Sequence, residues 1–126
     1  MNRIFADQVR ASFEQIGFAP AQFVYFEGAD TDDGVSQCCG LTAVALARGT
    51  SLATLEESYE VDEAGSVVCR ELSLHPWYRT AFTVAFDGKS ERFALEIVPG
   101  DFHTMARQGW ADGRAAWDAV CDLAVK

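Results

Sequence analysis

Two adjacent cysteines near the middle of the chain are the residues that most suggest chemistry. Cys38 and Cys39 follow Gln37 in the segment 36–43, SQCCGLTA. If this segment opens a helix, one of the two thiols lies in the first turn. There the unpaired backbone amides and the helix dipole stabilise a thiolate and lower the pKa of the cysteine. Gln37 could then donate a hydrogen bond to an oxyanion. The pattern supports nucleophilic cysteine chemistry as one hypothesis.

Over about eight residues this segment resembles the start of the central helix in papain-like cysteine hydrolases, where a cysteine opens that helix. The resemblance implies a hydrolase or transferase, which needs a histidine base and a group that orients it. The two histidines are His75 and His103. His75 precedes Pro76 in an expected turn and His103 lies in an expected helix, whereas the family places its base at the beginning of a strand. The competing interpretation is that the cysteines are small buried packing residues.

Metal and cofactor motifs are missing from the sequence. No C-x₂-C pair occurs, and the spacing of cysteines and histidines fits no common zinc pattern. The run 30–34, DTDDG, resembles a calcium loop in composition, but Leu41 stands where such a loop requires a bidentate glutamate. Gly109 and Gly113 are interpreted as helix ends rather than as a nucleotide cradle. We expect neither a metal nor a cofactor.

The acidic residues are unevenly spread along the chain. There are 19 acidic and 10 basic residues, for a formal net charge of −9. Nine of the acidic residues and a single basic one, Arg48, fall between Glu27 and Cys69. Negative charge repels phosphate backbones and anionic lipid, so we expect no direct binding of nucleic acid or membrane. It attracts a basic protein. The alternative is that these acids lie on solvated loops and only maintain solubility.

A basic partner would be met by acidic side chains and by aromatic anchors. Trp77 and Tyr78 follow Pro76 in an expected loop and precede Arg79, and exposed aromatics beside arginine are common interface anchors. The candidate partner-binding residues are Asp30, Asp32, Asp33, Glu56, Glu57, Glu60, Asp62, Glu63, Trp77 and Tyr78.

Length and composition indicate one folded domain spanning 1–126. Apolar residues make up 49% of the chain, which is enough for a core. The longest apolar stretches are under ten residues, and a bilayer span needs about 20. The N-terminal sequence MNRIFADQVR does not resemble a signal peptide. We therefore expect a cytoplasmic protein whose four cysteines are free thiols, with a disulfide from Cys38 or Cys39 to Cys69 or Cys121 as the alternative.

The first half of the chain predicts a helix, a strand and a helical middle. Phe5, Val9, Phe13 and Ile16 share one face of an expected helix that starts at Asn2 and stops at Gly17. The aromatic and β-branched segment 22–27 predicts a strand. The segment 36–48 fits a helix or a buried strand, with helix favoured, and a short helix is expected over 51–59.

The second half predicts an antiparallel sheet followed by helix. Strands are expected over 67–74, 80–86 and 92–98, the last two joined as a hairpin through 87–90. After Pro99 the chain returns to helix, with a break expected at Gly109. The resulting fold class is α+β: a single domain with an antiparallel sheet of about 3–5 strands and helices at both termini packed on one face.

Without a complete catalytic set, the sequence favours a binding protein. The favoured hypothesis is a small acidic cytosolic inhibitor, of the immunity-protein, antitoxin or phage-inhibitor type, that neutralises a basic partner such as a nuclease. One alternative is a cysteine-dependent hydrolase or transferase using Cys38 or Cys39. Another is an acidic secretion chaperone with apolar grooves for an extended segment.

Overall fold

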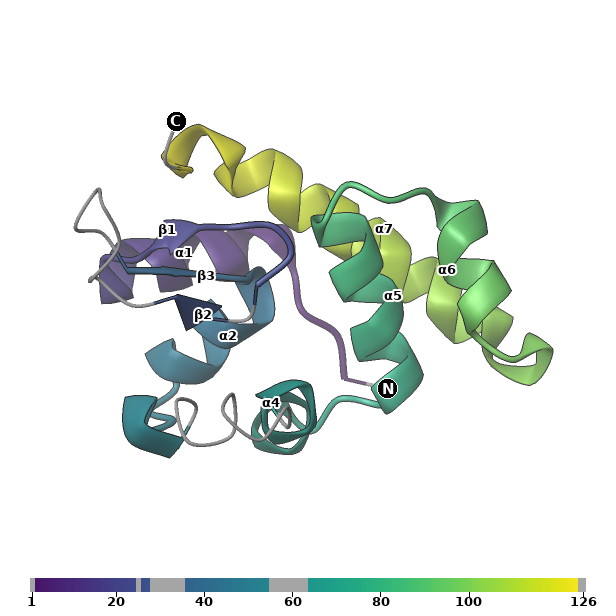
Figure 1. The fold of residues 1–126 in the computed structure, drawn as a ribbon, viewed down its shortest axis with the longest axis horizontal. Coiled ribbons are helices and arrows are strands. Elements are labelled where there is room, and N and C mark those ends of the chain that lie inside the picture. The colour runs from purple at the N-terminus through teal and green to yellow at the C-terminus, as the bar shows by residue number, and fades with distance from the viewer. Residues whose placement is uncertain (1, 25, 28–35, 55–63, 125–126) are drawn as a thin grey trace.

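The fold is mostly helical and carries one very small sheet (Figure 1). The computed structural model describes residues 2–24, 26–27, 36–54 and 64–124. The elements are α1 (Ala6–Ile16), β1 (Ala19–Pro20), β2 (Phe26–Glu27), β3 (Gln37–Cys38), α2 (Gly40–Ala47), α4 (Ala64–Leu72), α5 (Pro76–Phe86), α6 (Glu91–Ile97), the 3₁₀ turn η1 (Gly100–Phe102), α7 (His103–Val120) and the 3₁₀ turn η2 (Cys121–Leu123). Residues 52–54 are also helical.

The predicted α+β fold with an antiparallel sheet of several strands is wrong. The described sheet has three strands of two residues each, in the order β1-β3-β2. β1 pairs with β3 in parallel, with Ala19 opposite Gln37, and β2 pairs with β3 antiparallel, with Phe26 opposite Cys38. Of the expected strand 22–27, the last two residues form β2, and the described residues 22–24 are not a strand. The sheet serves mainly to hold the loop around Phe23 next to the start of α2.

The predicted hairpin strand 80–86 lies instead within α5. Tyr78, Phe82 and Phe86 are spaced four residues apart and stack along one helix face, with ring centroids 6.2 and 6.4 Å apart. Because α5 is buried on several sides, its apolar residues also occur at alternating positions, and this is the pattern expected of a strand. His75 caps the helix and Pro76 occupies its first turn, which are ordinary helix-start signals.

The predicted return strand 92–98 is also wrong, because these residues form α6. Ser90 accepts a hydrogen bond from the Phe93 backbone nitrogen at 3.1 Å and caps this helix. Gly88, in the segment expected to close a hairpin, adopts φ +86° just after the end of α5. The segment 87–90 therefore joins two helices.

The third predicted strand, 67–74, forms most of α4. Val68 and Leu72, spaced four residues apart, are buried on one face of that helix. The β-branched valines favoured a strand in the prediction, but their strand preference is modest and was outweighed by tertiary burial.

Two glycines of α7 allow it to pack closely on α5. Gly109 and Gly113 lie inside α7, so the interpretation as helix ends is wrong. A Cβ atom on Gly113 would lie 2.2 Å from the backbone oxygen of Phe82, and one on Gly109 would lie 2.7 Å from that of Tyr78. The two helices therefore touch backbone to backbone, and Figure 1 shows them side by side.

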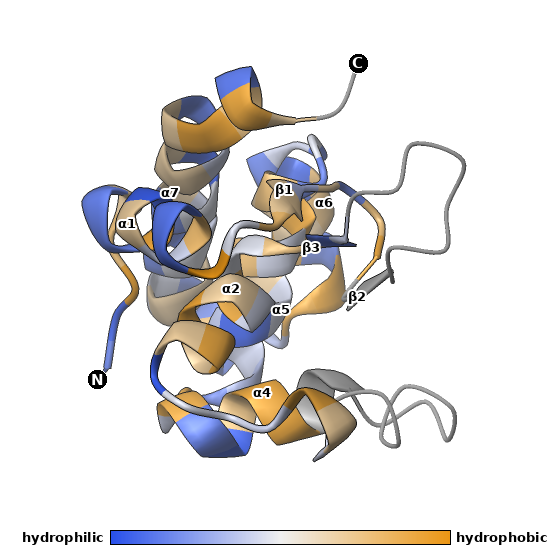
Figure 2. Ribbon diagram, turned by 90° about the vertical axis from the view of Figure 1, so that its left-hand side faces the viewer, coloured by the Kyte–Doolittle hydropathy of each residue, from blue (hydrophilic) through white to orange (hydrophobic). Residues whose placement is uncertain are grey.

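The N-terminal helix and the helical middle are predicted correctly in type, but the first helix begins at Ala6 and not at Asn2, whose side chain donates to the Ser73 carbonyl instead. Val9 and Phe13 are buried on α1, and Gly17 ends that helix with φ +75°. Phe5, expected on the same face, is 49% exposed. The segment 36–48 contains α2, whose residues 40–45 are all buried. Figure 2 shows α2 mostly in the colours of apolar residues. The part of the expected helix 51–59 beyond residue 54 lies outside the described residues.

Candidate functional site

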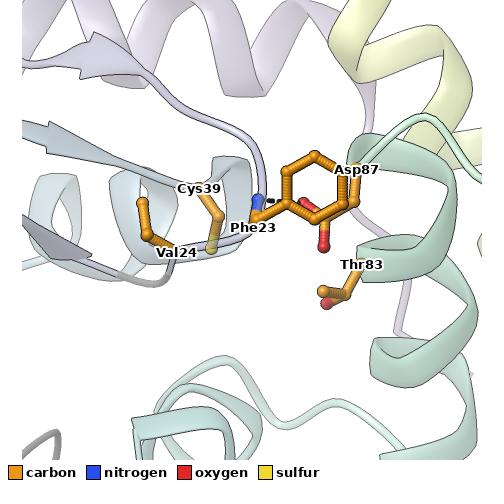
Figure 3. A pocket seen from close by; sticks show the side chains of 5 residues that line it. All are labelled: Phe23, Val24, Cys39, Thr83 and Asp87. Carbon is orange, nitrogen blue, oxygen red and sulfur yellow. Dashed lines mark hydrogen bonds between the residues drawn. The ribbon is translucent and has the colours of Figure 1, made fainter.

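A small pocket lies where the loop before β2, the start of α2 and the end of α5 meet (Figure 3). Its volume is about 60 Å³. Phe23 and Val24 come from the loop, Cys39 precedes α2, and Thr83 and Asp87 come from the carboxyl end of α5. An aromatic ring, a thiol, a hydroxyl and a carboxylate are thus gathered around one cavity.

Phe23 is held at this pocket in a strained backbone conformation. Its φ is +68°, a region that residues other than glycine seldom adopt, and its side chain is 66% exposed. The backbone nitrogen of Phe23 donates to Asp87 Oδ1 at 2.7 Å, and Gln22 Nε2 donates to the Phe86 carbonyl at 3.0 Å. These bonds fasten the loop to the end of α5. Strain of this kind costs about 1–3 kcal/mol and occurs preferentially at functional sites.

Asp87 carries the negative charge of the pocket. It caps the carboxyl end of α5, where the helix dipole disfavours an anion. Burial raises the pKa of Asp87, while the Phe23 backbone N–H and the charge of Lys89 lower it. Within the described part of the chain, no cation forms an ion pair with this carboxylate.

Cys39 is a buried helix cap rather than an activated nucleophile. Its Sγ accepts a hydrogen bond from the Thr42 backbone nitrogen at 3.5 Å and lies 3.2 Å from Thr42 Oγ1. Burial raises the pKa of Cys39 despite these contacts, and the charge of Asp87 adds to the rise. Burial raises the pKa of Cys38 still further. Neither environment favours the thiolate that a nucleophilic cysteine needs.

The two histidines make their hydrogen bonds to partners other than Cys38 and Cys39. His75 caps the other end of α5, and its Nδ1 accepts from the Trp77 backbone nitrogen at 3.1 Å. The eleven residues of α5 span about 16 Å at ~1.5 Å per residue, which separates His75 from the pocket. The Nε2 atom of His103 is 2.8 Å from the Val98 carbonyl. Gln37 lies on β3. Among the described residues, no hydrogen bond joins a histidine to Cys38 or Cys39, and no group of three or more His, Cys, Asp or Glu side chains could hold a metal ion.

A second polar cluster, which the sequence did not reveal, joins the N-terminal segment to α5 and α7. Buried Asp112 accepts hydrogen bonds from Tyr78 Oη at 2.5 Å and from Gln108 Nε2 at 3.0 Å. Arg3 meets the same carboxylate through Nη2 and Nε, at 2.9 and 3.1 Å. The Ile4 backbone nitrogen donates to Tyr78 Oη at 2.9 Å. Burial and Asp112 raise the pKa of Tyr78. This closed network stabilises the fold.

The structure gives the two predicted aromatic anchors different environments. Tyr78 is fully buried and offers no surface to a partner, whereas Trp77 is partly buried and packs on a core cluster that includes Ala81 and Val84. The predicted acidic partner-binding residues all fall outside the described residues: Asp30, Asp32, Asp33, Glu56, Glu57, Glu60, Asp62 and Glu63.

Sequence reasoning missed Phe23, Thr83 and Asp87. Each was assigned to a different strand or turn, so nothing in the sequence indicated that they meet. The available signals were the helix-start pair at 75–76 and the Asp-Gly pair at 87–88, which ends a helix as readily as it turns a hairpin.

No protein family, curated protein or solved structure matches the chain. Among the described residues, no helix is both long and apolar enough to cross a bilayer.

Proposed function

We propose that the protein is a small acidic inhibitor that binds and neutralises a basic protein in the cytoplasm. It would belong to the immunity-protein, antitoxin or phage-inhibitor type, and a nuclease or another nucleic-acid-binding protein is the expected partner. The observation that supports this proposal is the segregation of charge along the chain. Segments 28–35 and 55–63 hold eight acidic residues and no basic one, while the rest holds eleven acidic and ten basic residues.

The helical body is thus nearly neutral and takes part in local ion pairing. Arg10 pairs with Glu14 and Asp122, Arg92 with Glu96, and Arg114 with Asp118. The excess negative charge belongs to two segments anchored by folded elements: 28–35 joins β2 to β3, and 55–63 precedes α4. Such segments would compete with phosphate for a cationic surface, and their long-range attraction would accelerate association.

The cysteine-dependent alternative has little support from the geometry. Both Cys38 and Cys39 are buried with raised pKa values, and the histidines are engaged at other places in the described fold. A binding function requires no reactive thiol.

The test compares two variants that change the net charge by the same amount. In the first, the acidic residues of 55–63 become their amides: Glu56→Gln, Glu57→Gln, Glu60→Gln, Asp62→Asn and Glu63→Gln. In the matched control, five exposed acids of the helical body are neutralised: Asp7→Asn, Glu14→Gln, Glu71→Gln, Glu96→Gln and Asp101→Asn.

Basic proteins retained on the immobilised wild-type protein are identified and purified, and their association rates are then measured at low and high salt. We expect the first variant to associate at least about tenfold more slowly at low salt and to lose most of the salt dependence. The control variant should keep the wild-type association rate and its salt dependence. Equal rates for the first variant and the wild type would refute the electrostatic mechanism.

A further inference from the structure

Two polar side chains, those of Thr83 and Asp87, line the pocket beside Phe23. Thr83 Oγ1 is buried and has no hydrogen-bond partner among the described residues. One oxygen of Asp87 accepts from the Phe23 backbone, and Figure 3 shows the other turned toward Thr83. A buried polar atom without a partner calls for an explanation. A lysine ammonium supplies three donors and no acceptor, which suits this set.

The charge of Asp87 is placed where it costs stability. It is partly buried at the carboxyl end of α5, and no described cation pairs with it. Two other titratable groups face it: the neutral thiol of Cys39, and Lys89, whose ammonium lies 5.8 Å from the ring centroids of both Phe23 and Phe93. A carboxylate left in this position is available to an incoming cation.

The apolar wall of the pocket fits the stem of a lysine side chain. Phe23 and Val24 line one side, and the Phe23 ring is largely exposed despite its strained backbone. A cation near the face of an aromatic ring is attracted by the electrons of the ring, and methylenes pack on apolar surface.

The size of the pocket selects among basic side chains. A volume of about 60 Å³ accommodates roughly four to six water-sized groups, at about 10–15 Å³ for each. That space fits an ammonium with its last methylenes. The planar guanidinium of arginine is broader than an ammonium and needs more of this space.

We propose that the pocket of Phe23, Val24, Cys39, Thr83 and Asp87 receives one lysine side chain of the basic partner. The ammonium donates to the free Asp87 oxygen and to Thr83 Oγ1, and the methylenes pack against Phe23 and Val24. That the lysine belongs to a partner protein rests on the proposed function. That the pocket binds a lysine side chain does not depend on the proposed function.

The test uses short peptides in place of the partner. An acetylated Gly-Lys-Gly amide is titrated into isotopically labelled protein, and backbone resonances are followed by NMR. The same peptide with norleucine replacing lysine removes the charge and keeps the methylenes, and an arginine peptide tests selectivity. Asp87→Asn removes the charge with little change in shape, and Asp101→Asn removes an exposed carboxylate elsewhere.

We expect the lysine peptide to shift the resonances of residues 23, 24, 83 and 87, and the norleucine peptide to leave them in place. Asp87→Asn should weaken binding about tenfold, as expected for one charge-assisted pair, while Asp101→Asn should not weaken it. Phe23→Ala should weaken binding as well, whereas Phe5→Ala, which removes another exposed aromatic ring, should have no effect.

Several results would overturn the proposal: no shifts with the lysine peptide, equal binding by Asp87→Asn, or equal shifts with norleucine. Each variant is first shown to unfold cooperatively, so that loss of the fold is separated from loss of the site. If the lysine peptide binds but no basic partner is found, the pocket assignment stands and the inhibitor function fails. If a partner binds Asp87→Asn with full affinity, the pocket assignment fails and the inhibitor function stands.

Discussion

Replacing Gly113 with alanine would place a methyl group inside the backbone of α5. The new Cβ would lie 2.2 Å from the carbonyl oxygen of Phe82 and 2.9 Å from its carbonyl carbon. Backbone atoms cannot move aside as the end of a flexible side chain can, so α5 and α7 must separate. Separation would also disturb Tyr78 and Asp112, which join the same two helices.

The magnitude follows from two opposing effects. Alanine in a helix is more favourable than glycine by about 1 kcal/mol, because glycine loses more backbone entropy on folding. Overpacking a core costs about 1–3 kcal/mol and sometimes more. Because the clash here is with backbone, we take an overpacking cost slightly above that range, about 3–4 kcal/mol, and expect Gly113→Ala to destabilise the protein by roughly 2–3 kcal/mol net, a large fraction of the ~5–15 kcal/mol typical of a domain.

Urea unfolding monitored by circular dichroism measures this change and allows an ordered comparison. Gly109→Ala, with its Cβ 2.7 Å from the Tyr78 oxygen, should destabilise less than Gly113→Ala. In Gly40→Ala the new Cβ would meet only side-chain atoms, at 3.0 Å from Phe86 and 3.2 Å from Val9, so this variant should be destabilised less than Gly109→Ala. Gly100→Ala has nothing within 4 Å and is the control. If Gly113→Ala were as stable as the wild type or more so, helix propensity alone would govern this position and the close packing of α5 on α7 would be refuted.

Three further predictions concern polar and thiol groups. Burial raises the pKa of Asp87 above its ordinary 3.8, so the folded chain binds that proton more tightly than the unfolded chain; the resulting stability is present below pH 3.8 and is lost as the pH rises through the folded pKa. Asp87→Asn should therefore be more stable than the wild type at pH 7, by less than about 1 kcal/mol after solvent screening. Urea unfolding midpoints at several pH values should show this difference between the two proteins becoming smaller toward low pH. Tyr78→Phe removes one of the hydrogen bonds to buried Asp112, which keeps those from Arg3 and Gln108, and it takes from the Ile4 backbone N–H its acceptor; it should destabilise the protein by about 1–3 kcal/mol in the same unfolding assay, and an unchanged midpoint would contradict the network. A thiol reagent should label exposed Cys121 quickly in the native protein and the three buried cysteines only after unfolding; rapid labelling of a buried cysteine near pH 6 would revive the cysteine-dependent alternative.

The sequence predicted the parts of this fold in which local signals agree. The first helix has a regular apolar spacing that includes Val9 and Phe13 and ends at a glycine, and it forms with the expected end but begins at Ala6 rather than at Asn2. The middle segment was ambiguous by period, but its alanines and Gly49 favoured helix, and α2 forms there. In these elements propensity, spacing and stop signals point to the same structure.

The second half was mispredicted because burial on several sides conceals the helical period. In α5, Phe82, Val84 and Phe86 are all buried, so a pattern of alternating apolar residues says little about which structure forms. The signals that would have decided correctly were the His75 cap with Pro76 in the first turn, and the Ser90 cap of α6. The candidate pocket was beyond prediction, because it brings together residues from three elements whose contact depends on the helical packing.

The measurement that tests the central claim most directly is the association rate of the purified basic partner with the variant lacking the five carboxylates of 55–63. If negative charge in that segment draws the partner in, this rate falls by at least about tenfold at low salt and converges with the wild-type rate at high salt. An unchanged rate at low salt, with the control that loses five carboxylates from the helical body slowed instead, would contradict the account.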